Sequence, residues 1–327
     1  MTDDRISDID VFVFCNARDE LYLGPLAEDE CINERGYIVR KGNGTIYPTQ
    51  DRSVVVRVTT ESGVVGWGET YGICAPRATG EILVDLLAPV LKGQSVEDIE
   101  GIWQRLYNLM RVRGFFSGFY LDAIAAIDIA LWDIKGKNRQ QPVSRLLNAN
   151  SVQRVPAYIS GLPAESIEEK IDIASYWFER GFNQFKIAAA VSHDGVFEEL
   201  AALRRVLGDE VELMVDLHWK YDEDEALALI REIAPLNIAF AEAPLKPEDV
   251  SGLARLAKVS PVPLAGGEEW YTEYQASERI KRKAVAIVQP EMGHTGITQF
   301  LKIAQLANEW GCRLAPNATI GAGIFMA

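Results

Sequence analysis

The stretch 214-MVDLHW-219 decides the fold of this chain, because an apolar run in it ends on a carboxylate. The same ending recurs in FAEAP and LAGGEE, so that Asp216, Glu242 and Glu268 follow one another at intervals of 26 residues. One strand plus one helix fits this interval, and residues at the carboxyl ends of neighbouring barrel strands converge on one pocket. The alternative is that the three acids are unrelated and lie in solvent at their strand ends. Their equal spacing favours a shared site.

The chain around these acids alternates short apolar runs with amphipathic helical stretches. The runs predict seven strands: Pro156–Ser160, Gln184–Ile187, Glu212–Asp216, Ile238–Glu242, Pro263–Gly266, Ala286–Gln289 and Arg313–Pro316. The intervening stretches predict helices, among them Ile167–Arg180, Phe197–Leu207, Glu223–Ile233 and Ile297–Trp310. This order is typical of a parallel β/α barrel. A doubly wound sheet is the rival, but no glycine-rich phosphate turn follows the first of these strands.

The first part of the chain has a different pattern, with strands followed by helices. Two β-branched runs, Ser53–Thr59 and Val64–Glu69, are joined by a short turn and predict a hairpin. A long polar stretch, Asn16–Asp51, precedes them and is expected to be functional or mobile. We therefore expect an α+β domain over residues 1–150 and a barrel domain over 151–327. The seventh predicted strand lies close to the end of the sequence, so a segment that would close the barrel is expected to be missing.

Composition excludes several classes of protein. The chain has 327 residues, of which 48% are hydrophobic and 24% are charged, and its net charge is −14. This balance is that of a globular protein, and the negative sign argues against nucleic-acid and membrane partners. The acidic N-terminus is unlike a secretory signal, so we expect a cytoplasmic protein. Four scattered cysteines predict free thiols rather than disulfides or a zinc site.

The three carboxylates predict a metal site. Brought together without cations, they would repel one another and raise one another's pKa. A hard divalent cation removes that cost, and oxygen ligands with open positions suit Mg²⁺.

Several segments resemble the enolase superfamily, in its mandelate racemase/muconate lactonizing enzyme branch. They are SVVVRVTTESGVVGWGE, AIAAIDIALWDIKGKNRQQPVSRLL, MVDLHW, FAEAP, LAGGEE and IVQPEMGHTGIT. The resemblance implies an α+β capping domain over a (β/α)7β TIM-type barrel, with Mg²⁺ bound by Asp216, Glu242 and Glu268. It also implies removal of the proton α to a carboxylate, and assembly as a homo-oligomer.

The sequence departs from that family at both usual bases. The Lys-x-Lys pattern at the end of the second barrel strand holds Lys186 and then Ala188, so the second lysine is absent. Where the racemases carry an aspartate and a histidine, this chain has Glu291 and Asn317. Asparagine can hydrogen-bond but cannot accept a proton at neutral pH. A racemase that uses two bases is therefore not expected.

His218 is the main acid–base candidate, two residues beyond Asp216. Alternation along a strand would direct both side chains into one pocket. The Asp-x-His arrangement resembles acid-sugar dehydratases of the branch, which implies that His218 protonates the departing β-hydroxyl or helps to move the α-proton. Histidine can do either at neutral pH. His294 and Glu291 are further acid–base candidates, and Lys186 is expected to neutralise the substrate carboxylate.

Four residues are candidate substrate contacts: Asn317, Trp270, Tyr22 and Arg40. The favoured function is a Mg²⁺-dependent dehydratase (a hydro-lyase) acting on a sugar acid, an aldonate or aldarate. One alternative is an epimerase or cycloisomerase of the same superfamily. Another is a catalytically weak relative that binds a metal ion and an acid.

Overall fold

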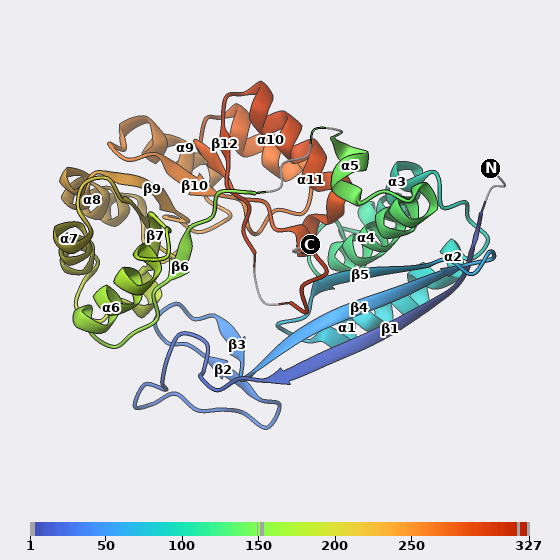
Figure 1. The fold of residues 1–327 in the computed structure, drawn as a ribbon, viewed down its shortest axis with the longest axis horizontal. Helices are drawn as coiled ribbons and strands as arrows, with labels where there is room; N and C mark the ends of the chain where they lie inside the picture. Colours follow the sequence, from blue (N-terminus) through green and yellow to red (C-terminus); the bar gives the residue numbers. More distant parts are fainter. Residues whose placement is uncertain (1–3, 149, 151–153, 319–320, 326–327) are drawn as a thin grey trace.

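The computed structural model describes residues 4–148, 150, 154–318 and 321–325. Figure 1 shows a curled parallel sheet covered by helices on one side of the molecule, and an antiparallel sheet packed on helices on the other. The expected fold class is confirmed: an N-terminal capping domain adjoins a C-terminal barrel domain. No helix in the described part of the chain is long and apolar enough to span a membrane.

The capping sheet has three antiparallel strands in the order β1-β4-β5. Their bounds are β1 Ile6–Ala17, β4 Gln50–Thr60 and β5 Val65–Tyr71. Helix α4 (Phe119–Arg139) covers one face, where Val54, Val56 and Val58 are buried. Gly68 allows this close approach, because a Cβ atom there would lie 1.9 Å from the carbonyl oxygen of Ala126. The predicted hairpin is present, and its open end is longer than predicted, by three residues at the start of β4 and by two at the end of β5.

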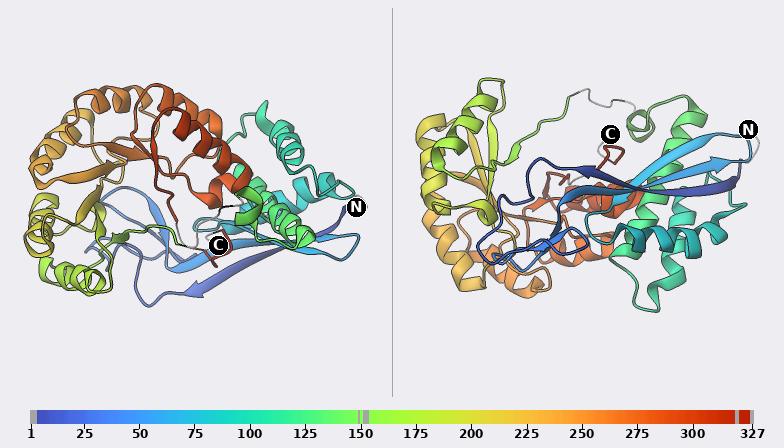
Figure 2. Two further views of the ribbon diagram at one scale, coloured as in Figure 1. Left: turned by 45° about the horizontal axis from the view of Figure 1, so that its top comes forward. Right: turned by 90° about the horizontal axis from the view of Figure 1, so that it is seen from below.

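Shorter elements complete the cap. They are β2 Tyr37–Val39, β3 Ile46–Pro48, α1 Pro76–Glu81, the π-helix η1 Ile82–Leu87, α2 Ala88–Leu91, α3 Ile99–Arg111 and α5 Val143–Leu147. Strands β2 and β3 form a small antiparallel pair inside the long polar stretch 16–51. This stretch extends from the capping sheet towards the barrel strands (Figures 1 and 2).

Within the described residues, the barrel sheet has seven parallel strands in the order β6 to β12, with β6 and β12 at the edges. They are β6 Ile159–Gly161, β7 Gln184–Ala188, β8 Glu212–Asp216, β9 Ile238–Glu242, β10 Leu264–Gly266, β11 Ile287–Val288 and β12 Arg313–Leu314. All seven overlap the predicted runs. Strand register pairs Ala188 with Asp216, and Asp216 with Glu242, so these three strand ends lie at one level.

Helices lie outside this curled sheet. They are α6 Ile167–Phe178, η2 Ala189–Val191, α7 Val196–Leu207, α8 Glu223–Ile233, η3 Ala234–Leu236, α9 Val250–Val259, α10 Glu273–Lys281 and α11 Met292–Glu309. Local sequence sets their starts: Ser166 caps α6, and Asp222 with Glu225 forms a capping box at α8. Helix α11 packs against α4 and joins the two domains.

Candidate active site

The three predicted carboxylates come from consecutive strand ends. Asp216 and Glu242 are the last residues of β8 and β9, and Glu268 follows β10 by two residues. Burial raises the pKa of Glu268 well above its usual value, and the charges of Glu242 and Asp216 raise it further. Burial likewise raises the pKa of Glu242, although Lys186 opposes this. The structure therefore brings together the repelling group of acids that the spacing predicts.

Lys186 supplies the positive charge inside this group. Its side chain is buried in the middle of β7, and its Nζ donates to a carboxylate oxygen of Glu242. Burial opposes the charge on Lys186, but Glu242 and Asp216 outweigh burial and raise its pKa. Lys186 also lies over the ring of Tyr158, 5.4 Å from its centre. The lysine is thus held as a cation beside the acids.

The donor chemistry of these acids fits Mg²⁺. Three carboxylates with one lysine leave two negative charges, and Glu242 Oε1 is buried without a hydrogen-bond partner. In the described part of the chain, no three acidic, histidine or cysteine side chains lie close enough together to coordinate one metal ion without moving. Asp216, Glu242 and Glu268 would hold the ion, since hard oxygen donors of this kind are its preferred ligands.

His218 lies beside Asp216, but strand alternation is not the reason. Strand β8 ends at Asp216, and His218 and Trp219 have φ angles of 56° and 54°. This left-handed turn is uncommon for such residues and marks a constrained position. The backbone N–H of His218 donates to Asp216 Oδ1 at 2.9 Å, and its Nδ1 lies 3.5 Å from Asp216 Oδ2. The proposed proximity is present, with a different local cause.

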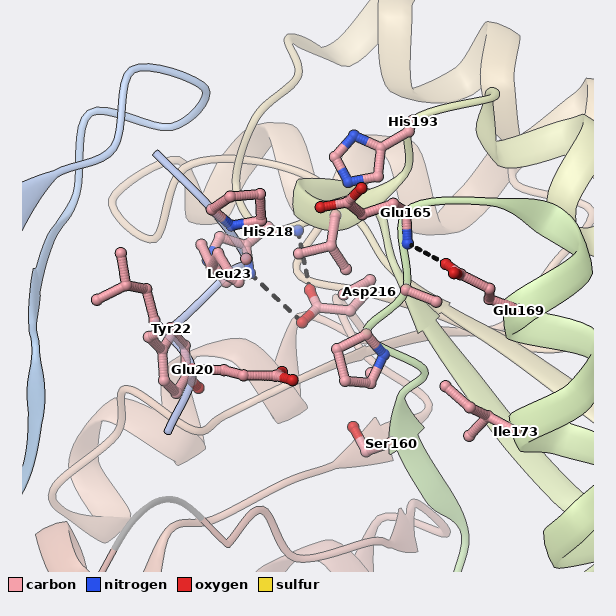
Figure 3. Close-up of a pocket in the computed structure, with 18 of the residues that line it drawn as sticks. Glu20, Tyr22, Leu23, Ser160, Glu165, Glu169, Ile173, His193, Asp216 and His218 are labelled. Carbon is pink, nitrogen blue, oxygen red and sulfur yellow. Dashed lines mark hydrogen bonds and ion pairs between the residues drawn. The ribbon is translucent and has the colours of Figure 1, made fainter. Parts of the chain in front are cut away.

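A cavity of about 1010 Å³ opens at these residues (Figure 3). Asp216, His218 and Ala188 line it from the barrel, and Tyr22 lines it from the cap. Ala188 presents only a methyl group where the resembling family carries its second lysine. His193 also lines the cavity, from the exposed loop after β7. The cavity is therefore built by both domains.

The replacements at the other base position lie together. Glu291 is 1% exposed, and Asn317 Nδ2 donates to its Oε2 at 3.1 Å. The backbones of the two residues also form an isolated parallel bridge. This pair takes the place of the aspartate–histidine pair, and its amide cannot serve as a base.

His294 lies at the contact between the two domains. Its Nδ1 is 2.6 Å from Asp122 Oδ1, and its ring contacts the rings of Tyr71 and Tyr271 at centre distances of 4.3 and 4.6 Å. Burial opposes charge on His294, but Asp122 outweighs it and raises the pKa. Helix α4 of the cap and helix α11 of the barrel supply this pair, so the structure links His294 to domain contact rather than to the cavity wall.

The remaining candidates differ in their surroundings. Trp270 is 1% exposed and packs in the barrel core, with its Nε1 donating to Glu269 at 2.9 Å. Arg40 donates to the carbonyl oxygens of Tyr22 and Pro25 and to Glu30 at 2.7 Å. The Arg40 guanidinium is therefore turned towards its own loop, while the Tyr22 ring lines the cavity.

Sequence reasoning missed Tyr47. Its hydroxyl lies 2.7 Å from His218 Nε2, although the two residues are 171 positions apart. Only the pairing of β2 with β3 could have drawn attention to this residue, and that short hairpin carries little sequence signal.

Comparison with known proteins decides the family. The profile of the mandelate racemase/muconate lactonizing enzyme N-terminal domain matches residues 44–148, and that of the enolase C-terminal domain-like family matches residues 170–327. The chain belongs to the mandelate racemase/muconate lactonizing enzyme family of the enolase superfamily.

Two similar relatives in this family are named as sugar-acid enzymes. A D-galactarolactone cycloisomerase of Agrobacterium fabrum is 35% identical, over 84% of this chain and 72% of the relative. An arabinonate dehydratase of Saccharolobus solfataricus is 33% identical, over 82% of this chain and 73% of the relative. Because relatives in the family are named as dehydratases, the comparisons are consistent with this chain being a hydro-lyase.

Solved structures agree in fold. A member of the enolase superfamily from Agrobacterium tumefaciens has a TM-score of 0.96 at 49% identity, and the match covers 99% of this chain and 83% of that one. An L-talarate dehydratase from Polaromonas sp. JS666, complexed with Mg and L-glucarate, has a TM-score of 0.82 at 27% identity and covers 99% and 84%.

Proposed function

We propose that this protein is a Mg²⁺-dependent dehydratase of a sugar acid, an aldonate or an aldarate. The observation that carries the proposal is the placement of His218 against Asp216 at the wall of a large cavity, beside Lys186 and the further acids Glu242 and Glu268. Relatives named as dehydratases and a neighbour complexed with Mg and L-glucarate support it.

Each side chain has a proposed part in the reaction. When bound, Mg²⁺ supplies positive charge that stabilises the anion formed on the substrate carboxylate. Lys186 contributes a second cation near that carboxylate. His218 and Glu291 are the two candidates for the base that removes the α-proton in place of the missing lysine. His218 protonates the β-hydroxyl as its carbon–oxygen bond breaks, and the resulting enol becomes a 2-keto-3-deoxy acid with release of water.

The test is a screen of aldonic and aldaric acids with and without Mg²⁺, read by formation of 2-keto-3-deoxy products. We expect product from at least one acid, in the presence of Mg²⁺ only. The His218→Asn variant should lose at least about a hundredfold in kcat, in line with the contribution of a general acid. Product formation at the wild-type rate by this variant would refute the role of His218.

A cycloisomerase is the second candidate. The 35% identical D-galactarolactone cycloisomerase favours it. This reaction rearranges a ring without losing water, so its product would have the same mass as the substrate, whereas a dehydratase product is lighter by one water molecule. A cytoplasmic location, a homo-oligomeric state and the domain division at residue 150 stay predictions from the sequence.

A further inference from the structure

We propose that Tyr47 is the positioning residue of His218, and that the cap thereby sets the orientation of the acid–base group of the barrel. This inference rests on the proposed function in one respect only, which is the reaction that His218 carries out on a substrate. The contact itself is between a strand of the small hairpin β2–β3 and the turn that follows β8.

The contact is specific at both ends of the imidazole ring. The Tyr47 hydroxyl lies 2.7 Å from His218 Nε2, while the other ring nitrogen lies 3.5 Å from Asp216. Asn43 Nδ2 in turn donates to the Tyr47 hydroxyl at 3.0 Å. Tyr47 is 8% exposed, so this chain of contacts is largely screened from water.

Loss of the hydroxyl would free the ring. Torsions that end on a planar ring have broad preferences, and the approach of Nδ1 to Asp216 is too long for a strong hydrogen bond. The Tyr47 hydroxyl occupies Nε2, so Nδ1, which has no hydrogen-bond partner and faces Asp216, is the nitrogen left to act on a substrate. The Tyr47 hydroxyl is therefore the group that directs the reactive nitrogen.

Tyr47 does this without touching the substrate cavity. Within the described part of the chain, the cavity wall on the cap side includes Tyr22 but not Tyr47. The Tyr22 ring stacks on the Tyr47 ring at a centre distance of 5.0 Å, and Arg18 lies over Tyr22 at 5.0 Å. A ligand that presses on Tyr22 would therefore act on the residue that holds His218.

The hairpin offers a matched control. Tyr37, on the partner strand β2, accepts a hydrogen bond from the backbone N–H of Ala75 at 2.9 Å, and Arg52 lies over its ring. Tyr37→Phe and Tyr47→Phe each remove one hydroxyl from the same hairpin, and only Tyr47→Phe removes the contact with His218. Thermal unfolding of both variants will show that the fold is retained.

The first arm of the experiment is spectroscopic. The chain has 3 histidines, so imidazole ¹⁵N NMR of the labelled protein gives three resolvable sets of signals. The His218→Asn variant assigns one set. Tyr47→Phe should shift the His218 set and leave the other two in place, whereas Tyr37→Phe should leave all three. An unshifted His218 set in Tyr47→Phe would overturn the proposal.

The second arm is kinetic, with a sugar acid that the enzyme converts. We expect Tyr47→Phe to lower kcat by about tenfold or more, because misorientation of a general acid removes much of its contribution. KM should change by less than about threefold, because Tyr47 does not line the cavity. Unchanged kcat, or equal losses in both variants, would contradict the proposal. If no sugar acid is converted, the proposed function fails while the NMR arm still decides the role of Tyr47.

Discussion

Glu69 offers the sharpest test of how the cap is attached to the chain beyond β12. Its side chain is 0% exposed, and its carboxylate accepts hydrogen bonds from the backbone N–H groups of Gly323 at 3.1 Å, Ile324 at 2.7 Å and Phe325 at 3.4 Å. The N–H of Ala322 also donates to it. A segment that follows the last barrel strand is thus folded around one acid of the capping sheet.

Glu69→Gln keeps the shape of the side chain and replaces one acceptor oxygen by an NH₂ group. The N–H groups of Gly323, Ile324 and Phe325 all donate to one carboxylate oxygen, Oε2. When an NH₂ group replaces this oxygen, these N–H groups lose their acceptor and face a second donor. Hydrogen bonds to a charged group contribute about 1.5–3 kcal/mol each, so loss of two of them costs about 3 kcal/mol at the low end. That cost falls on local opening of the segment, where it corresponds to roughly hundredfold faster amide exchange.

Hydrogen exchange at residues 322–325 measures this directly. We expect these amides to exchange at least about a hundredfold faster in Glu69→Gln than in the wild type. Glu61→Gln is the matched control, since Glu61 lies in the exposed turn of the same β4–β5 hairpin. Equal protection of residues 322–325 in all three proteins would refute the reasoning.

Three further predictions concern the site and the domain contact. Saturating Mg²⁺, at about a hundred times Kd, should stabilise the wild type by about 2.7 kcal/mol and leave Asp216→Asn unchanged; an equal rise in both variants' unfolding temperatures would contradict the metal site. Lys186→Met leaves the buried Glu242 charge uncompensated, so urea unfolding should show a loss of about 3–5 kcal/mol, and an unchanged midpoint would argue against the ion pair. Asp122 raises the pKa of His294, so this pair should stabilise the fold below the ordinary histidine pKa and lose that contribution as pH rises through the raised value. Unfolding temperatures across pH should therefore converge between wild type and His294→Gln at high pH, and parallel curves would contradict this.

The barrel could be predicted because each βα unit repeats a local pattern. A short apolar run and an amphipathic helix recur, with a carboxylate after the run in three units, so the levels of Asp216 and Glu242 follow from connectivity alone. The same logic failed locally at His218, where a left-handed turn and not strand alternation places the ring. Backbone conformations of this kind are stabilised by surrounding contacts that a single sequence does not display.

The cap contributions could not be predicted for a related reason. Arg40 is a candidate substrate contact because it lies in the long polar stretch 16–51 of the cap, and its donors are used by the carbonyl oxygens of Tyr22 and Pro25. His294 was expected as an acid–base group because it follows Glu291 closely, yet its partner is Asp122, 172 positions away. Pairings across such separations depend on how two domains dock.

The long-range contacts have a common consequence for the site. Tyr47 with His218, Asp122 with His294, and Glu69 with the segment 322–325 each join a polar group of the cap to one beyond β6. Buried polar groups that lose their partners are costly, so the cap cannot shift on the barrel without breaking these bonds in favour of water. Only the Tyr47 contact ends on a residue that lines the cavity. The other two contacts therefore fix the position of the cap on the barrel. The Tyr47 contact makes the orientation of the His218 imidazole depend on that position. It follows that weakening the Glu69 contact should reduce catalysis less than Tyr47→Phe does, although it should loosen the domain contact more.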